Sequence, residues 1–253
     1  MKEICQVNIK NKKSNFYQVD KNLIFFERID RYDFSKSVIE TFAQNWFIAF
    51  LTKAPASLEI RNGNNFLTVK SPMGIIIPPF SIIEWRIGIG DLEWKGFFSK
   101  ISFSVRNFNR PCTFSNFCIP TSNTELKNLT DKIIVDHEIN ISKDNSWLSE
   151  KTKEIIDLQF RDDFKIEEIA EKLSANRSFI ARSFKKSYGL SPVDYRHKLR
   201  VFEGLRLMNQ ERLNITQSAV DSGFSSIQRF EEHFKEQIGV APSKFSFARI
   251  QKK

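Results

Sequence analysis

Residues 177–192 read RSFIARSFKKSYGLSP, and residues 227–242 read IQRFEEHFKEQIGVAP. The second stretch aligns with the first without a gap, at an offset of 50 in the numbering. The equivalent identical positions are Phe184/Phe234, Lys185/Lys235, Gly189/Gly239 and Pro192/Pro242. A repeat of this period indicates two copies of one supersecondary unit.

The first copy has the pattern of two short helices joined by a turn. An apolar stripe on the first helix is formed by Ile166, Ile169, Ala170 and Leu173. The second helix is predicted over residues 177–188, with Ile180, Phe184 and Tyr188 four apart on its inner face. Asn176 is a suitable N-cap for this helix, and Gly189 is suited to end it.

The second copy has the same pattern of two short helices, joined by a longer turn. We expect Ile215, Ala219 and Val220 to face inward and Gly223 to make the turn. Ser225, with Gln228 three residues later, resembles a capping box at the start of the next helix. The small residues Ala170 and Ala219 would allow the two helices of each unit to cross closely, as a helix-turn-helix requires.

A connecting helix is predicted over residues 192–209. Its inner face carries Tyr195, Leu199, Phe202 and Leu205, and we expect Lys198, Arg200 and Arg206 to point outward. Such a helix would hold the two units at a fixed separation. For both second helices to enter successive major grooves on one face of DNA, their centres must lie about 34 Å apart.

The motifs of this region are highly specific. They are Ile-Ala-x-x-Leu, Ser-Phe-Ile-Ala-Arg-Ser-Phe-Lys-Lys-x-x-Gly-x-Ser-Pro-x-x-Tyr-Arg and, in the second copy, Gly-Phe-x-Ser-x-x-x-Phe-x-x-x-Phe-Lys-x-x-x-Gly-x-x-Pro. Together they resemble the AraC/XylS family of transcription regulators, over about 100 residues from Trp147 onward. The resemblance implies a bacterial, sequence-specific DNA-binding protein.

The resemblance also implies which side chains contact DNA. Base-edge contacts fall at Ser178, Ala181 and Arg182, and Arg182 is the strongest candidate because a guanidinium can pair with both O6 and N7 of guanine. Lys185 and Lys186 suit phosphates, which fix register without reading sequence. The full predicted set is Arg177, Ser178, Ala181, Arg182, Lys185, Lys186, Ser225, Ser226, Ile227, Gln228, Arg229, Glu231 and Lys235.

The second recognition helix departs from the family's usual pattern. Glu231 and Glu232 stand where members commonly carry basic or neutral polar residues. Gln228 can read adenine and a glutamate can accept from cytosine N4, but adjacent acids near phosphates lower affinity. We expect this helix to bind DNA more weakly than the first recognition helix, or mainly to position the protein.

The N-terminal half has the sequence pattern of an antiparallel β domain. Short apolar runs between Trp46 and Phe98 are separated by Pro, Gly and Asn, and one or two earlier strands are expected over residues 15–29. Asn62-Gly63 lies between two such runs and indicates a hairpin with a type I′ turn. The half shows no specific motif, and it is compatible with the small cupin-like barrels that often precede the AraC-type domain.

The predicted fold is therefore a two-domain α+β protein. It has an N-terminal antiparallel cupin-like β barrel over residues 1–122 and an all-α DNA-binding domain over 147–253, with two helix-turn-helix units joined by a helix. Residues 123–146 are predicted as a linker helix and loop: helical spacing runs from Thr124 to Ile139, and residues 140–146 are polar. The helix is either a dimer contact or packs on its own barrel.

Composition limits the remaining possibilities. A net charge of +9 fits a polyanion partner, nucleic acid before an anionic membrane surface. The 3 cysteines have no metal-like spacing, and the N-terminus has no secretory pattern, so we expect a cytoplasmic, nucleoid-associated protein. His137, His197 and His233 are the only histidines and are predicted to lie outside the barrel, which argues against a metal centre.

No catalytic constellation or cofactor is expected. Cys112 lacks the neighbours of an alkyltransferase nucleophile, and a lone cysteine is more often a small buried hydrophobe. A Phe- and Ile-lined barrel could instead hold a small apolar or anionic effector, with Arg86 or Lys95 neutralising a carboxylate at its mouth. The alternative is that these aromatic residues are simply core.

Two functions from different classes stay open at the level of sequence. The first is a transcription regulator, most simply an activator, with promoter DNA and RNA polymerase as partners and a homodimer as its form. The second is an architectural or antagonist protein that uses the same domain without activating. An effector-binding enzyme with an appended DNA-binding module is disfavoured, because the catalytic residues are missing.

Overall fold

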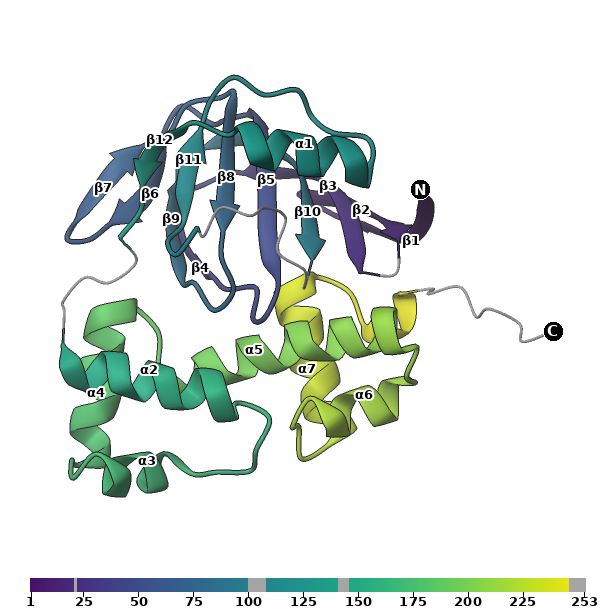
Figure 1. Cartoon of the computed structure of the whole chain (residues 1–253). Coiled ribbons are helices and arrows are strands. Elements are labelled where there is room, and N and C mark those ends of the chain that lie inside the picture. The colour runs from purple at the N-terminus through teal and green to yellow at the C-terminus, as the bar shows by residue number, and fades with distance from the viewer. Residues whose placement is uncertain (21, 100–107, 141–145, 246–253) are drawn as a thin grey trace.

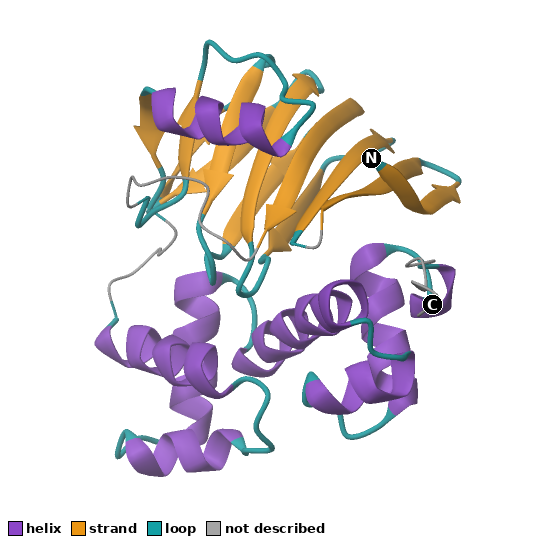
Figure 2. Ribbon diagram, turned by 45° about the vertical axis from the view of Figure 1, so that its right-hand side comes forward, coloured by secondary structure: helices purple, strands orange, loops and turns teal. Residues whose placement is uncertain are grey.

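The computed structural model describes residues 1–20, 22–99, 108–140 and 146–245. Two antiparallel sheets and one helix form the N-terminal part, and the remaining helices lie beneath the lower ends of the strands (Figure 1). Colouring by secondary structure separates the two parts clearly (Figure 2). The predicted two-domain α+β architecture is confirmed.

The larger sheet has eight strands and the smaller has four. In spatial order the larger sheet contains β1 (Lys2–Ile9), β2 (Lys12–Asp20), β3 (Leu23–Tyr32), β10 (Gly90–Ser99), β5 (Trp46–Lys53), β8 (Met73–Ile77), β11 (Cys112–Phe114) and β12 (Val135–Glu138). The smaller contains β4 (Lys36–Glu40), β9 (Ile83–Ile87), β6 (Leu58–Asn62) and β7 (Asn65–Thr68). All pairings are antiparallel among the described residues.

The apolar run of β5 is explained by burial of both its faces. Phe47, Ala49 and Leu51 belong to the core that includes Leu58 and Ile60 of the smaller sheet. The alternate residues Ile48 and Phe50 belong to a second core on the outer face of the larger sheet. Helix α1 (Asn123–Lys132) covers that face and contributes the fully buried Leu126.

Two predictions near this domain were wrong in detail. The hairpin after Leu58 forms, but Asn62 pairs with Asn65, so its loop is Gly63-Asn64 and only Gly63 has positive φ (61°). This arrangement is typical of a type II′ rather than a type I′ turn. The helix predicted to reach Ile139 ends at Lys132, and the chain then forms β12 beside β11.

The segment predicted as a linker therefore contributes to the sheet domain. Within it, α1 packs on the larger sheet, and His137, expected outside the barrel, lies on the edge strand β12 opposite Thr113. Of the loop predicted over residues 140–146, residues 141–145 lie outside the described residues. The side chains of β12 are all exposed, and without alternation of polar and apolar residues no local pattern indicates a strand there.

The helical part contains both predicted helix-turn-helix units. Its elements are α2 (Trp147–Gln159), α3 (Ile166–Lys172), α4 (Arg177–Tyr188), α5 (Pro192–Arg206), the π-helix η1 (Leu207–Glu211), α6 (Ile215–Asp221), α7 (Ile227–Ile238) and the 3₁₀ turn η2 (Pro242–Lys244). The recognition helix predicted over residues 177–188 has these bounds. No helix among the described residues is both long and apolar enough to cross a bilayer.

Aromatic side chains join the two parts directly. Phe42 and Phe98 of the sheet domain contact the ring of Phe202 on α5, with ring centroids 5.3 and 5.9 Å away. Phe16 on β2 contacts Phe245 beyond α7 at 5.3 Å. Burial of this aromatic surface links the helices to the sheets through the hydrophobic effect.

Candidate nucleic-acid interface

The first recognition helix, α4, is held by its apolar face. Ile180 and Phe184 are fully buried, and the Phe184 ring lies 5.7 Å from the Tyr195 ring of α5. Asn176 caps the helix as predicted, because its side chain accepts from the amide of Ser178 at 2.8 Å. Gly189 ends it in the left-handed conformation with φ 82°.

A chain of hydroxyl groups joins α4 to α2. Ser183 Oγ lies 2.9 Å from Ser146 Oγ and 2.8 Å from Ser149 Oγ, and Ser187 Oγ donates to Ser149 Oγ at 2.9 Å. Small side chains at these positions allow the two helices to pack closely while their polar groups stay satisfied. This contact fixes the side of α4 that cannot face DNA.

The opposite side of α4 carries the predicted DNA contacts. Arg177, Ser178, Arg182, Lys185 and Lys186 are exposed, and Ala181 is partly buried. Arg182 donates through Nε to Ser178 O at 3.3 Å and forms no ion pair with any described residue. Its guanidinium is therefore presented on the surface, one turn above the start of the helix.

Arg177 has a partner within the unit. Its Nη1 lies 2.6 Å from Glu167 Oε1 on α3, although both side chains are largely exposed. An exposed pair of this kind contributes little to stability and is screened by salt. Phosphates could therefore compete with Glu167 for Arg177.

The second recognition helix, α7, is capped one residue later than predicted. Ser226, not Ser225, is the N-cap, and its hydroxyl accepts from the amide of Arg229 at 3.3 Å. Val220, expected to face inward, is 59% exposed because α6 buries Ser218 and Ala219 instead. Gly223 makes the turn as expected, with φ 95°.

Gly223 also meets a steric requirement that the sequence did not show. A Cβ at this position would lie 2.3 Å from the carbonyl oxygen of Arg161. The turn of the second unit therefore packs directly on the backbone after α2. Only glycine satisfies both this close approach and the positive φ.

The exposed face of α7 is mixed in charge. Ser225, Ser226, Ile227, Gln228, Arg229, Glu231, Glu232 and Lys235 are all exposed. Gln228 Nε2 donates to Glu232 Oε1 at 3.0 Å, so the amide and the acid engage each other in the absence of DNA. Lys235 lies in the last turn and lines a pocket between the domains.

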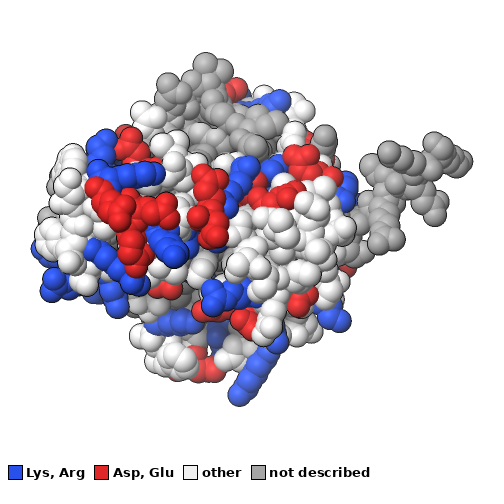
Figure 3. Space-filling model, turned by 90° about the horizontal axis from the view of Figure 1, so that it is seen from below, with Lys and Arg blue, Asp and Glu red and all other residues white. Residues whose placement is uncertain are grey.

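Both recognition helices begin on the side of the helical part that faces away from the sheets (Figure 1). Viewed from that side, the surface carries lysine and arginine interspersed with aspartate and glutamate (Figure 3). This face is thus not uniformly positive.

The connecting helix differs from its prediction in two respects, the first being that α5 ends at Arg206 and is followed by the π-helix η1. Arg200 and Arg206 were expected to point outward, but they are 5% and 8% exposed. Arg200 donates to the carbonyl oxygens of Phe160 and Asp162, at 2.5 and 2.9 Å. Helix α5 is enclosed by the two units and the sheet domain, so its polar side chains find partners inside the molecule.

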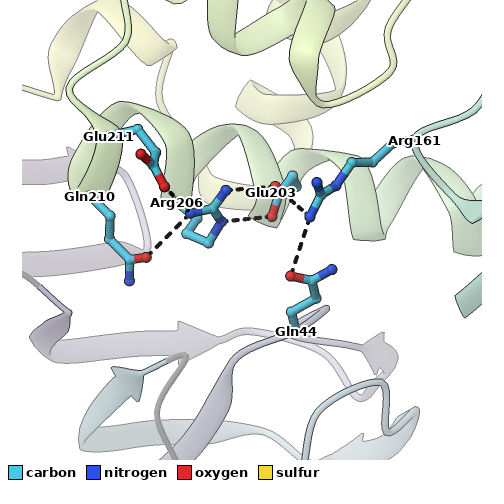
Figure 4. Close-up of polar contacts among 6 residues, drawn as sticks. All are labelled: Gln44, Arg161, Glu203, Arg206, Gln210 and Glu211. Carbon is cyan, nitrogen blue, oxygen red and sulfur yellow. Dashed lines mark hydrogen bonds and ion pairs between the residues drawn. The ribbon is translucent and has the colours of Figure 1, made fainter. Parts of the chain in front are cut away.

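Arg206 belongs to a network that reaches the sheet domain (Figure 4). Its Nη2 lies 2.9 Å from Glu203 Oε1, and Arg161 Nη2 lies 2.9 Å from the same oxygen. Arg161 also donates to Gln44 Oε1 of the sheet domain at 3.3 Å. The buried Glu203 carboxylate thus organises two arginines, one of which spans the domain boundary.

A pocket of about 1110 Å³ lies between the sheet domain and the helices. Its apolar wall includes Phe26, Phe47, Trp85 and Phe98 from the strands and Phe202 from α5. Its polar wall includes Lys12, Arg28, Asp30 and Glu40 from the strands and His197, Lys198, His233 and Lys235 from the helices. The aromatic residues are therefore partly core and partly pocket lining.

The two residues predicted to bind an effector do not line this pocket. Arg86 is exposed on the smaller sheet, where it lies 3.9 Å from Glu59 and stacks on the Phe66 ring. Lys95 pairs with Glu27 at 2.9 Å. Cross-strand acids already neutralise both charges, so the structure gives this prediction no support at this pocket.

Lys12 and Arg28 are the cations that sequence reasoning missed. Arg28 pairs with Asp30 and lies 3.5 Å from Glu40. Burial and the nearby Arg28 lower the pKa of Lys12 to about 8, although Asp30 and Glu40 oppose the shift. No local motif marks these residues, since they meet the helical residues only through the tertiary fold.

Comparison with known proteins gives the class of the helical part. A helix-turn-helix domain model matches residues 169–246. The Msm operon regulatory protein of Streptococcus mutans is 28% identical over 152 residues, which cover 58% of this chain and 54% of that protein. The transcriptional regulatory protein HptR of Staphylococcus aureus is 28% identical over 80 residues, covering 32% of this chain and 31% of that protein.

A solved structure gives the class of the whole fold. Unsaturated fatty acid bound ToxT from Vibrio cholerae has a TM-score of 0.54 at 15% identity, covering 93% of this chain and 99% of that one. This likeness concerns the fold alone. The chain spans about half the length of the Msm regulator and about a third of that of HptR.

The fold and the paired units define a two-domain protein whose helical part carries a helix-turn-helix domain. The relatives that this chain matches are named as regulatory proteins. No cluster of three metal-ligating side chains occurs in the described part of the chain.

Proposed function

We propose that the protein regulates transcription by binding promoter DNA through α4 and α7 in adjacent major grooves. The observation that carries this proposal is the exposed face of α4, where Arg182 is free of ion pairs among the described residues while Ile180 and Phe184 anchor the helix. Arg182 reads guanine, with Ser178 and Ala181 beside it on the bases. Lys185, Lys186 and Arg177 contact phosphates.

The second helix-turn-helix unit contributes to DNA binding differently from the first. Ser225, Ser226, Ile227, Gln228 and Arg229 approach the DNA at the start of α7. Glu231 and Glu232 weaken the electrostatic part of binding on this side. Lys235 lines the pocket between the domains, so we propose that it contributes least to DNA contact.

We further propose that an amphipathic effector occupies the interdomain pocket and controls DNA binding. Aromatic side chains would hold its apolar body, and Lys12 would meet an acidic head group. The name of the structural neighbour states that ToxT binds an unsaturated fatty acid, and this chemistry suits the pocket. We also propose that the protein activates transcription through RNA polymerase and that it acts as a homodimer. Its expected location is the nucleoid, in the cytoplasm.

The expected domain boundaries remain a proposal with one modification. We place the sensor and dimerisation domain at 1–122 and the DNA-binding domain at 147–253, and we assign α1 and β12 of the 123–146 segment to the packing of the sensor domain. The exposed side chains of β12, at the edge of the larger sheet, would leave room for a second copy. Sedimentation velocity with and without DNA tests the dimer.

Chromatin immunoprecipitation with sequencing tests the main proposal. We expect enrichment at a small set of promoters that share one motif. Fluorescence anisotropy should show that the purified protein binds a duplex with that motif at physiological salt. A reporter driven by an enriched promoter separates activation from the architectural or antagonist alternative. Enrichment without any common motif would contradict sequence-specific binding.

A further inference from the structure

Lys12 connects the sheet domain to the end of the second recognition helix. It is the first residue of β2, and its Nζ donates to the carbonyl oxygen of Ile238 at 3.2 Å. Ile238 is the last residue of α7. A hydrogen bond between residues 226 positions apart thus ties a strand to the C-terminal carbonyl of a DNA-contacting helix.

The end of α7 is built to receive this cation. The last carbonyl groups of a helix lack partners within the helix and carry partial negative charge. Gly239 ends α7 with φ 101°, and a Cβ there would lie 3.2 Å from Lys12 Nζ. The lysine stem therefore passes directly over the glycine that ends the helix.

Lys12 still has hydrogen-bonding capacity. An ammonium group has three donors, and Lys12 forms no ion pair with any of residues 1–20, 22–99, 108–140 and 146–245. The neighbouring Arg28 is instead paired with Asp30 and Glu40. Lys12 and Lys36 are strand cations of the pocket without a carboxylate partner in the described chain, and of these two Lys12 is the one that donates to the end of α7.

We propose that Lys12 couples the interdomain pocket to α7: an acidic head group in the pocket accepts a hydrogen bond from the same ammonium that caps the C-terminal end of this recognition helix. The coupling rests on the effector part of the proposed function. A bound anion keeps the ammonium charged and in place, which strengthens the cap. Loss of the anion destabilises the last turn of α7 and weakens the packing of this turn against the sheet domain.

Hydrogen exchange followed by mass spectrometry on the full chain tests this coupling. The probes are oleate, below its critical micelle concentration, and methyl oleate, which has the same chain without the charge. The variants are Lys12→Met, Lys12→Arg and Lys13→Met. Lys13 is the matched control, because it is the next residue on β2 and is exposed on the opposite face of the strand.

The expected result has two parts. In peptides covering the last turn of α7, Lys12→Met exchanges on the order of two- to tenfold faster than wild type, whereas Lys12→Arg and Lys13→Met do not. Oleate slows exchange there in wild type and Lys13→Met, but not in Lys12→Met, and methyl oleate has no such effect. Calorimetry with oleate on each variant reports binding separately from exchange.

Three outcomes would overturn the coupling. Equal exchange in Lys12→Met and Lys13→Met would show that Lys12 does not cap α7. Protection of α7 by oleate in Lys12→Met would show that another residue carries the signal, while the effector proposal would stand. Absence of oleate binding to wild type would contradict the effector proposal itself, and faster exchange in Lys12→Met would then identify a structural cap only.

Discussion

Gly204 of α5 lies against the ring of Phe230 of α7, so closely that a Cβ on Gly204 would be 2.4 Å from Phe230 Cε2. Phe230 is fully buried and projects from the first half of the second recognition helix. The missing side chain on the connecting helix therefore sets how near α7 can approach it. Because α5 also supports α4 through Tyr195, this contact helps to set the relation between the two recognition helices.

Gly204→Ala should move or destabilise α7. The added methyl group overpacks a filled site, and we expect a loss of about 1–3 kcal/mol in the free energy of unfolding, measured by urea denaturation. The double variant Gly204→Ala with Phe230→Leu should recover part of this loss, because the smaller side chain makes room. A single variant as stable as wild type would mean that α5 and α7 adjust without strain.

Arg182→Ala should reduce sequence preference while preserving the fold. A bidentate contact to guanine contributes about 1–3 kcal/mol of discrimination, so we expect the preference for the cognate promoter over a scrambled one to fall by about ten- to a hundredfold. Lys185→Ala is the matched control on the same helix. It should weaken both sequences equally and reduce the salt slope by about 1. Undiminished preference in a gel shift of Arg182→Ala would contradict the assignment.

Glu231→Gln combined with Glu232→Gln should strengthen DNA binding. Removing two exposed acids from the face of α7 lowers repulsion from phosphates, and we expect affinity for any duplex to rise by about two- to tenfold at low salt. Glu236→Gln, on the last turn of the same helix, should have little effect. If the double variant bound more weakly, these acids would instead be base contacts, as acceptors for cytosine N4.

Local sequence signals predicted the helical part well. Asn176 and Gly189 bound α4 because capping and left-handed termination depend on residues next to the helix end. The start of α7 was predicted less accurately, because two adjacent serines, Ser225 and Ser226, could both act as the N-cap. In the structure the N-cap is Ser226. Helix bounds could therefore be predicted to within a residue where a single capping residue was available.

Tertiary burial could not be predicted in the same way. Arg206 has the spacing of a solvent-facing residue on an isolated helix, yet the sheet domain covers α5 and Glu203 satisfies the buried guanidinium. Likewise, Lys12 meets Ile238 only because strands and helices distant in sequence pack together. The ion-pair partners of Arg86 and Lys95 could not be predicted for the same reason, since strand register places Glu59 and Glu27 opposite them.

Glu203→Ala should destabilise the protein strongly. This carboxylate is 1% exposed and lies 2.9 Å from both Arg206 and Arg161, so its removal leaves a buried guanidinium with less compensation. We expect a loss of about 3–5 kcal/mol in the free energy of unfolding by chemical denaturation. Glu211→Ala should cost below about 1 kcal/mol, because that partner of Arg206 is 54% exposed. Equal effects of the two variants would show that Glu203 is not the centre of the network.

His197→Phe should remove part of the acid sensitivity of folding. Burial, then the neighbouring His233, Arg196 and Arg200, lower the pKa of His197 to about 4 from 6.5, although Asp194 opposes the shift. Between these values the unfolded chain binds a proton that the folded chain does not, so stability is full above about pH 6.5 and decreases as the pH falls toward 4. We expect this histidine to account for about 2 kcal/mol of that decrease, allowing for solvent screening at a half-buried ring. Urea denaturation at intervals across this range measures the slope, and His137→Gln on the exposed strand β12 should keep the wild-type slope. A wild-type slope in His197→Phe would assign the acid sensitivity to other groups.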